Sequence, residues 1–479
     1  MQTRNQSRSA RSWLQDAPRQ QRPAPGRGAG SVDTVVRWPR SIALRPIAAL
    51  RPSPNNPRTH SAKQIQQLVA SIRRFGFVVP LLTDGEDRIL AGHGRLEAAK
   101  LLGMAEVPAL RIEHLSEAER RAYTIADNRL AQLSGWDEAA LAAEFEALEE
   151  LAFELPEVTG FETAQIDQLL EAPLEQDTDP DDAVAEPDPS AQPVSRPGDL
   201  WQLGPHRLLH GDGTKAAGYV RLMGDERARM VITDPPYNVP IAGHVSGLGR
   251  VRHREFTQAS GELSSAQFAA FLRRALTAMA AHCRDGALIY TCMDWRHVGE
   301  LLAAARPGLG APVNLCVWAK TNAGMGSLYR SQHELVLVFK AGKGPHLNNV
   351  QLGATGRYRS NLWTYAGANA FGRNRDRDLA DHPTVKPVAL VADVIRDCSR
   401  RGEIVLDGFC GSGTTLLAAE RTGRVARAIE LDGIYIDVAI RRFAARTGVM
   451  ARHAASGRSF GEIAAKRGSE PSPNRRARP

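Results

Sequence analysis

Apolar residues recur at regular spacing in two stretches of the chain, which a strongly polar stretch separates. In the first stretch, a helical repeat predicts a helix that Ser61 caps and that ends near Arg74. Strands are predicted at 77–82 and 88–91, and a second helix at 96–102. The apolar face of the first helix consists of Ile65, Leu68, Val69, Ile72 and Phe75. These elements predict a small α+β module.

The second stretch alternates short apolar runs, which predict buried strands, with helical patterns. Strands are predicted at 208–210, 230–232, 335–340, 404–407 and 425–429, and helices at 389–396 and 416–421. Such alternation is typical of an open α/β sheet, in which ligands bind at the carboxyl ends of the strands.

Charge divides the chain as sharply as hydropathy does. The 479 residues carry a net charge of +8, yet residues 137–199 hold 19 acidic residues and one basic residue. The remainder has a net charge of +26, which suits a polyanion, although an Arg-rich composition alone gives the same number. Residues 171–198 are rich in Pro and Asp and predict an extended, self-repelling linker.

Several classes of protein are excluded by composition. No apolar run approaches the ~18 residues of a membrane span, and the N-terminus lacks the apolar core of a secretory signal. All five cysteines lie beyond residue 282, and none has CxxC spacing. We therefore expect a cytoplasmic protein without a membrane partner, a disulfide framework or a bound metal.

A turn of Gly92, His93, Gly94 and Arg95 lies between a predicted strand and a predicted helix. Free N–H groups at a helix start, with an arginine beside them, suit a phosphate; a purely structural turn is the alternative. With Arg58 in Pro-Asn-Asn-Pro-Arg and a later Ala-Asp-Asn-Arg-Leu, the turn resembles the ParB/sulfiredoxin-like N-terminal domain. The resemblance implies a nucleoside triphosphate site at Arg58 and the turn.

Two departures limit that resemblance. Partition proteins carry Glu-Arg-Arg after the first glycine, so nucleotide hydrolysis is not implied here. Sulfiredoxins need a cysteine in this turn, and the first cysteine of the chain is Cys283, which excludes their redox reaction.

The strand at 230–232 leads into Asp234, Pro235, Pro236 and Tyr237. Two consecutive prolines end the strand and stiffen the chain at its carboxyl edge. The carboxylate can accept a hydrogen bond from an exocyclic amine, and the tyrosine can stack on the ring that carries the amine. An ordinary strand-ending turn rarely has these four residues, so the motif predicts binding of a nucleobase amine.

The strand at 404–407 enters a Gly-rich turn and continues as a helix. Asp407 would repel a phosphate, and the helix starts without a lysine, so the turn suits a cationic, amino-acid-bearing ligand. The next strand ends in Glu430, where an acid commonly binds ribose hydroxyls. An adenosyl group with a charged amino acid describes S-adenosylmethionine.

The order of these motifs resembles the β-class amino DNA methyltransferases, which make N6-methyladenine or N4-methylcytosine: Asp-Pro-Pro-Tyr, then His-Pro-Thr-Val-Lys-Pro at 382–387, then the Gly-rich turn. The resemblance implies a Rossmann-like S-adenosylmethionine-dependent methyltransferase fold with a mixed, mainly parallel sheet. It assigns the target base and catalysis to Asp234, Pro235, Pro236 and Tyr237. It assigns cofactor binding to Asp407, Phe409, Gly411, Gly413, Thr414, Glu430, Asp212, Thr384 and Lys386.

Loops outside this core are expected to read DNA. The candidates are Arg250, Arg252, Arg254, Arg357, Arg359, Arg373 and Arg375. Arginine can read guanine or hold a phosphate, while a solvated basic loop is the alternative. The pair His333-Glu334 is interpreted as framework, without a catalytic role.

We therefore expect a site-specific methyltransferase that acts on the N6 amine of adenine in double-stranded DNA, because Asp precedes Pro-Pro-Tyr. The alternatives are an N4-cytosine enzyme, a ParB-like DNA-binding protein with a vestigial methyltransferase fold, and a nuclease–methyltransferase. The oligomeric state is left open. The expected domains are a disordered basic arm (1–38), the ParB/sulfiredoxin-like domain (39–136), an acidic helical extension (137–170), the linker (171–198), the methyltransferase domain (199–450) and a basic tail (451–479).

Overall fold

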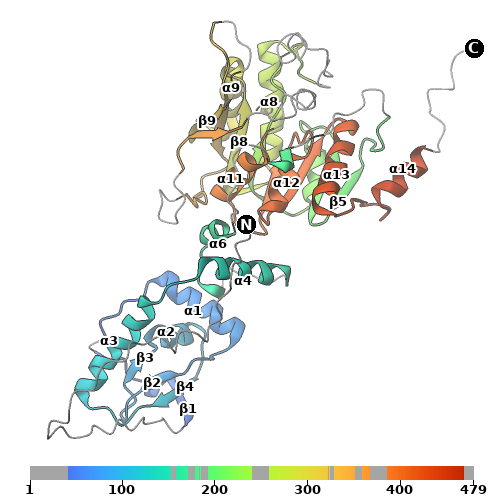
Figure 1. Cartoon of the computed structure of the whole chain (residues 1–479). Helices are drawn as coiled ribbons and strands as arrows, with labels where there is room; N and C mark the ends of the chain where they lie inside the picture. Colours follow the sequence, from blue (N-terminus) through green and yellow to red (C-terminus); the bar gives the residue numbers. More distant parts are fainter. Residues whose placement is uncertain are drawn as a thin grey trace, which may run out of the picture. The chain divides into compact units, whose positions relative to one another are not determined.

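The computed structural model of the chain consists of two compact units, Met1–Leu133 and Ser134–Pro479 (Figure 1). The basic arm predicted at 1–38 and the end of the predicted tail, 469–479, lie outside the residues that it describes. No helix among the described residues is long and apolar enough to cross a membrane. The described residues are 41–54, 56–151, 153, 158–170, 179–182, 184, 192–239, 258–321, 323, 328–350, 359–366 and 386–468.

The first unit is a small α+β fold built on a four-stranded sheet of order β1-β4-β2-β3. Strands β2 and β4 pair parallel, and the other pairs are antiparallel. The elements are β1 (Ile42–Pro46), α1 (Ala62–Phe75), β2 (Leu81–Thr83), β3 (Ile89–Ala91), α2 (His93–Leu101), β4 (Glu106–Arg111) and α3 (Glu117–Leu133). The core of this unit includes Leu81, Ile89, Leu96 and Val107.

The first helix of this unit was predicted correctly, whereas the strand that follows was predicted too long. Ser61 caps α1, its side chain accepting a hydrogen bond from the backbone N–H of Gln64. The strand predicted at 77–82 begins only at Leu81, and Val78 and Val79 are 72% and 55% exposed. Strand β3 has only three residues, so it does not extend far enough to pair with the first residues of the apolar run at 77–82.

The second unit contains a ten-stranded sheet of order β11-β9-β10-β8-β7-β12-β13-β6-β5-β14. Its centre, from β8 through β7, β12 and β13 to β6, is parallel. The strands are β5 (Leu200–Leu203), β6 (His206–His210), β7 (Ala228–Thr233), β8 (Cys283–Met293), β9 (Asn314–Lys320), β10 (His333–Lys340), β11 (Leu362–Tyr365), β12 (Ile404–Asp407), β13 (Val425–Glu430) and β14 (Arg452–His453). This arrangement confirms the predicted mixed, mainly parallel sheet.

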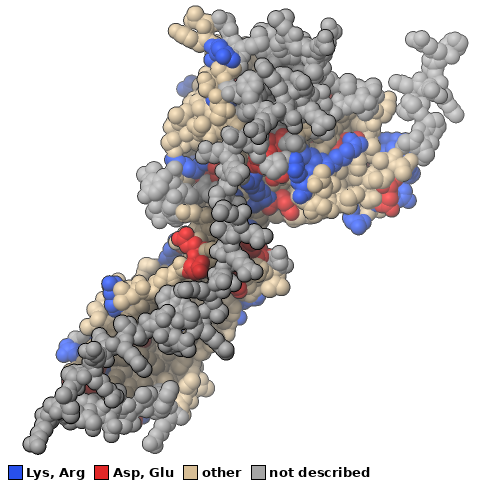
Figure 2. All heavy atoms as spheres, in the orientation of Figure 1, with Lys and Arg blue, Asp and Glu red and all other residues tan. Residues whose placement is uncertain are grey.

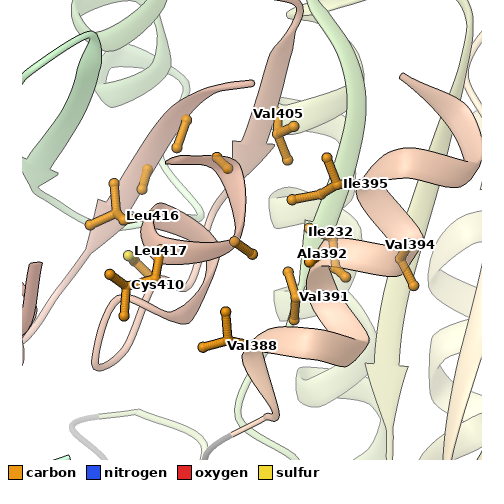
Figure 3. Close-up of a cluster of buried hydrophobic side chains, with 14 of the residues drawn as sticks. Ile232, Val388, Val391, Ala392, Val394, Ile395, Val405, Cys410, Leu416 and Leu417 are labelled. Atoms are coloured by element: carbon orange, nitrogen blue, oxygen red, sulfur yellow. The ribbon is translucent and has the colours of Figure 1, made fainter. Parts of the chain in front are cut away.

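Helices cover both faces of this sheet, which explains why its central strands are almost entirely apolar. One buried cluster joins the sheet to α11, α12 and α13, and another joins it to α7, α8 and α9. Figure 3 shows side chains of α11 and α12 gathered around Ile232 of β7 and Val405 of β12. The helices are α7 (Ala216–Met223), α8 (Ser265–Ala280), α9 (Val298–Leu309), α11 (Val388–Cys398), α12 (Thr414–Arg421), α13 (Gly433–Thr447) and α14 (Phe460–Gly468).

The acidic extension before the sheet is part of the second unit. It forms α4 (Glu138–Glu150) and α6 (Thr163–Leu169), which pack on each other through Phe145 and Ile166. Asp167 of α6 forms a two-pronged ion pair with Arg424, both N–O distances being 2.9 Å, and both side chains are 0% exposed. Arg401 pairs with Asp167 and Glu149. The extension is therefore anchored by fully buried charges.

Two segments that the sequence predicts as a linker and a basic tail contain folded elements. In the predicted linker, 180–182 form the short 3-10 helix η3, in which Asp181 pairs with Arg421 and Arg446, while Arg421 also pairs with the preceding Asp179. In the predicted basic tail, β14 and α14 pack on the sheet through buried Phe460 and Ile463. Ion pairs therefore stabilise the folded part of the linker, and buried apolar side chains stabilise the folded part of the tail.

We predict that Asp167→Asn destabilises the second unit by about 3–5 kcal/mol, because the substitution leaves Arg424 buried without its counter-ion. Urea unfolding followed by tryptophan fluorescence measures the loss. The matched control is Glu146→Gln in exposed α4 surface, expected to change stability by less than about 0.5 kcal/mol. Equal stability of the two variants would contradict the role assigned to the pair.

Candidate active site

The two motifs singled out in the sequence lie at the same edge of the large sheet. Strands β7 and β12 are parallel neighbours, with Met230 opposite Val405 and Val231 opposite Leu406. Their carboxyl ends therefore open into one cavity of about 210 Å³. Its lining includes Asp234, Pro235, Pro236, Tyr237, Glu334, Lys386, Asp407, Phe409, Gly411, Ser412, Thr414, Glu430 and Tyr435. The fold thus joins the predicted base site and the predicted cofactor site.

Asp234 is held by two neighbours that fix both of its oxygens. Its Oδ1 accepts a hydrogen bond from the Tyr237 hydroxyl at 2.6 Å, and its Oδ2 accepts one from Lys386 Nζ at 2.6 Å. Lys386 also donates to the Tyr237 hydroxyl at 3.1 Å. The tyrosine hydroxyl is anchored on both sides, so the orientation of its ring is set before any ligand enters.

Lys386 also serves a second carboxylate, which sequence reasoning treated as framework. Glu334, at the start of β10, lies 2.9 Å from Lys386 Nζ and 2.6 Å from Lys320 Nζ. Its carboxylate also accepts from Tyr237 at 3.2 Å. The sequence signal was the pair His333-Glu334 at a strand start, but nothing in the sequence showed that this strand lies beside β8 and faces the motif on β7.

The charges of this cluster are set by burial and by the two lysines. Burial opposes ionisation of Glu334, but Lys386 and Lys320 outweigh it and hold the pKa of Glu334 at about 2. Burial raises the pKa of Asp234, while Lys386 acts in the opposite direction. Burial also opposes the charge on Lys386, but the two carboxylates outweigh it and raise the pKa of Lys386. The cluster therefore consists of paired ions in a shielded place.

Asp407 braces the turn that follows β12. Its Oδ1 accepts from Thr233 Oγ1 at 2.9 Å and from the Phe409 N–H at 3.0 Å, and its Oδ2 accepts from Thr415 Oγ1 at 2.6 Å. Burial raises the pKa of Asp407 to about 6. The carboxylate thus ties the end of β7 to the turn and to the first turn of α12.

The Gly-rich turn needs its glycines for backbone shape and close packing. Gly413 has φ of 89°, and a Cβ there would lie 2.9 Å from the Cβ of Ala439 on α13. Gly411 has φ of 52° and lines the cavity, with open space where a Cβ would stand. The backbone is therefore exposed to a ligand at Gly411 and packed against a helix at Gly413.

Glu430 closes the other end of the cavity. Its carboxylate accepts hydrogen bonds from the backbone N–H groups of Gly411 at 2.7 Å and Asp432 at 2.8 Å. Burial nevertheless raises the pKa of Glu430 to about 7. The two oxygens keep unused lone pairs that face a cavity, which suits a ligand with hydroxyl donors.

Two of the predicted cofactor residues make other contacts, and a third lies outside the described residues. Lys386 lies among the catalytic candidates, because its ammonium is the counter-ion of Asp234 and Glu334. The side chain of Asp212 accepts from the N–H and hydroxyl of Thr214, and the cavity is lined by the neighbouring Gly213 instead. Thr384 lies outside the described residues.

The predicted DNA-reading arginines are mostly outside the described residues, namely Arg250, Arg252, Arg254, Arg357, Arg373 and Arg375. Arg359 is described, and its position contradicts the expectation. Its guanidinium pairs with Asp393 at 2.8 Å and Asp397 at 2.9 Å, and only 16% of the side chain is exposed. These ion pairs commit Arg359 to the framework of the domain.

In the first unit, the Gly-rich turn is shorter than predicted. Gly92, with φ of 102°, ends β3, and α2 already begins at His93, so Gly94 and Arg95 belong to the helix. His93 Nε2 lies 3.3 Å from the Ser53 N–H, and Arg95 donates to the Pro80 carbonyl at 3.4 Å. Arg58 donates to the Asn128 carbonyl at 3.5 Å.

Comparison with known protein families matches three parts of the chain. Residues 228–441 match a DNA methylase family, residues 39–129 match the ParB N-terminal domain, and residues 139–197 match a ParB-methyltransferase HTH domain. The chain therefore carries a domain of the N6/N4 DNA methylase family and an N-terminal ParB-like domain. Both predicted resemblances are confirmed, whereas the HTH family of the acidic extension was missed.

Individual relatives match separate parts of this methylase. The ParB-like nuclease domain-containing protein YnaK of Escherichia coli is 42% identical over 80 residues, which are 17% of this chain and 92% of that protein. The type II methyltransferase M.HpaI of Haemophilus parainfluenzae is 25% identical over 252 residues, 49% of this chain and 73% of that protein. Among solved structures, the putative DNA modification methylase TTHA0409 of Thermus thermophilus is 23% identical, with a TM-score of 0.35, over 53% of this chain and 97% of that one.

The ion cluster of the methylase yields a prediction that does not depend on its reaction. Lys386→Met should lower the free energy of unfolding at pH 8 by about 3 kcal/mol, because two partly buried carboxylates lose their shared, buried counter-ion. Adding Glu334→Gln removes one of those carboxylates and should recover at least about 1 kcal/mol. A double-mutant cycle by urea unfolding measures the coupling. Strictly additive effects would contradict the shared-counter-ion geometry.

Proposed function

We propose that this methylase transfers the methyl group of S-adenosylmethionine to the exocyclic N6 amine of adenine in double-stranded DNA. The observation that carries the proposal is that Asp234, held by Lys386 and Tyr237, opens into the same cavity as the Gly-rich turn and Glu430. Asp rather than Ser before Pro-Pro-Tyr favours adenine over cytosine.

The residues at the β12 and β13 ends fit S-adenosylmethionine. The buried carboxylate of Glu430 suits ribose hydroxyls, and the exposed backbone at Gly411 allows close approach of a ligand. Phe409, Thr414 and Tyr435 complete the lining on this side. When bound, the cofactor supplies an electrophilic methyl group on a sulfonium centre.

The residues at the β7 end fit a flipped base. A target amine is out of reach inside a duplex, so the adenine must leave the helix, and Tyr237 is placed to replace the lost stacking. The carboxylate of Asp234 accepts a hydrogen bond from the amine, orients its nitrogen and stabilises the positive charge that develops there. Lys386, 2.6 Å from Asp234, favours the ionised form of this carboxyl group.

Two partners follow from this proposal. Double-stranded DNA is the substrate, and the positive charge outside the acidic segment favours its approach. The first unit, through Arg58 and the residues from Gly92 to Arg95, is proposed to bind a nucleoside triphosphate; free N–H groups at the start of α2 support this.

The reaction is tested by incubating the protein with S-adenosylmethionine and unmethylated duplex DNA of diverse sequence, followed by mass spectrometry of the nucleosides. We expect N6-methyladenine. The isosteric variant Asp234→Asn should reduce its formation by roughly 10²–10³-fold, because the amide cannot stabilise the developing charge as a carboxylate does.

Two results would contradict this proposal in different ways. Formation of N4-methylcytosine in place of N6-methyladenine would support the proposed site but contradict adenine as the target base. Absence of any methylated nucleoside, with measurable cofactor binding, would favour a vestigial methyltransferase fold.

The raised pKa of Glu430 predicts a pH dependence of cofactor binding. A ribose hydroxyl donates to the ionised carboxylate, so the affinity should be full well above pH 7 and fall as the pH drops through about 7. The steepest decline expected from one group is about tenfold per pH unit. Isothermal calorimetry from pH 8.5 to 6.5 measures it, with Glu430→Gln expected to bind more weakly and without this dependence. A flat profile for the unaltered protein would refute the hydroxyl-binding role.

A further inference from the structure

The turn at 179–182 contacts the start of α11, the helix that follows Lys386. Asp182 Oδ1 accepts a hydrogen bond from the backbone N–H of Val388 at 2.7 Å. Val388 is the first residue of α11, and no side chain of its own N-cap residue, Pro387, makes this bond. Asp182 therefore caps α11 from a segment about 200 positions earlier in the chain.

This cap bears on the base side of the cavity. Lys386 stands two residues before Val388, and its ammonium holds Asp234, Glu334 and Tyr237 at once. A shift of the α11 start moves the lysine and with it the carboxylate that is to receive the amine. Asp182 is partly buried, and this burial raises its pKa to about 6.

The same turn reaches the cofactor side through Arg442 of α13. One guanidinium nitrogen of Arg442 donates to the Asp181 carbonyl at 2.7 Å. The other donates to the Ser412 carbonyl and hydroxyl, both at 3.1 Å, and to Thr414 Oγ1 at 3.2 Å. Ser412 and Thr414 line the cavity. One buried arginine thus links the turn to the Gly-rich loop.

The turn is anchored on either side of these contacts. Asp179 pairs with Arg421 at 2.5 Å, and Val184 is only 3% exposed. Farther along, Asp437 of α13 accepts from the backbone of Val194 and Ser195. Figure 2 shows basic and acidic side chains close together on one face of the second unit. The acidic segment is therefore fastened to the catalytic domain at several points.

We propose that the turn at 179–182 is a positioning element of the methyl-transfer site: Asp182 fixes the base side through α11, and Asp181, through Arg442, fixes the cofactor side. The inference rests on the proposed function, which it extends to the segment that joins the ParB-like and HTH-type parts to the catalytic domain. None of these residues touches the reacting atoms. Each acts by holding a group that does.

Steady-state kinetics of the full chain test the base side. Asp182→Ala should lower kcat about tenfold with little change in KM for S-adenosylmethionine, because the displaced Lys386 misaligns Asp234. Asp182→Asn should stay within about threefold of the unaltered protein, because its amide oxygen still accepts from Val388. The matched control is Asp179→Asn, which loses only the Arg421 pair of the same turn and should stay within about twofold.

Calorimetry tests the cofactor side independently of turnover. Arg442→Met should weaken S-adenosylmethionine binding about tenfold, because Ser412 and Thr414 lose their donor. Thermal unfolding of all variants identifies any that fail to fold, and Asp182→Asn preserves the test if Asp182→Ala is among them.

The possible results separate this inference from the proposed function. An unaltered protein that methylates DNA, with Asp182→Ala equally active or no more impaired than Asp179→Asn, overturns the positioning role alone. A protein that binds the cofactor without methylating DNA overturns the proposed function, and the comparison of Arg442→Met binding then decides the positioning role. Unchanged affinity in Arg442→Met overturns it.

Discussion

The position of one lysine ammonium governs the chemistry of this site. Lys386 Nζ lies 2.6 Å from Asp234 and 2.9 Å from Glu334, so it favours the ionised form of two carboxyl groups where burial opposes it. A buried charge without a counter-ion would neutralise or destabilise the fold. The role proposed for Asp234 requires a carboxylate, and this is the form that the lysine favours. The lysine contacts both carboxylates because the folded sheet brings the end of β7, the start of β10 and the start of α11 close together.

A second use of paired charge shapes the rest of the large unit. No lysine, arginine or histidine occurs from residue 130 to 195, although this segment covers all but the last two residues of the match to a ParB-methyltransferase HTH domain at 139–197. Contacts with phosphate groups dominate the affinity of proteins for DNA. A segment without basic side chains cannot form ion pairs with those phosphates. Its acids instead meet arginines of the methylase domain, among them the fully buried Arg424. In this chain the acidic segment is thus a docking element of the catalytic domain.

The candidate site was largely predictable where motifs are contiguous. Asp234 through Tyr237 and Asp407 through Thr414 each combine a strand end with a short run of unusual residues, so their position at a sheet edge follows from local pattern. Glu334 was not singled out because it belongs to no such run, and the contacts of Lys386 with Asp234 and Glu334 were not foreseen. Both omissions have one cause. The partners of a charged side chain depend on which elements become neighbours in space. Here Glu334 and Lys386 lie about 100 and 150 residues after the Asp234 motif in the sequence.

The sequence by itself determined the two families, the alternation of strands and helices and the residues of both motifs, because these depend on local spacing and residue type. Only the tertiary structure decided where charge is neutralised. Residues 179–182 read as a self-repelling linker until Arg421, Arg442 and Arg446 are placed around them, and Arg359 reads as a free DNA contact until Asp393 and Asp397 close on it. Coulombic energy depends on distance in space, and the sequence records only distance along the chain.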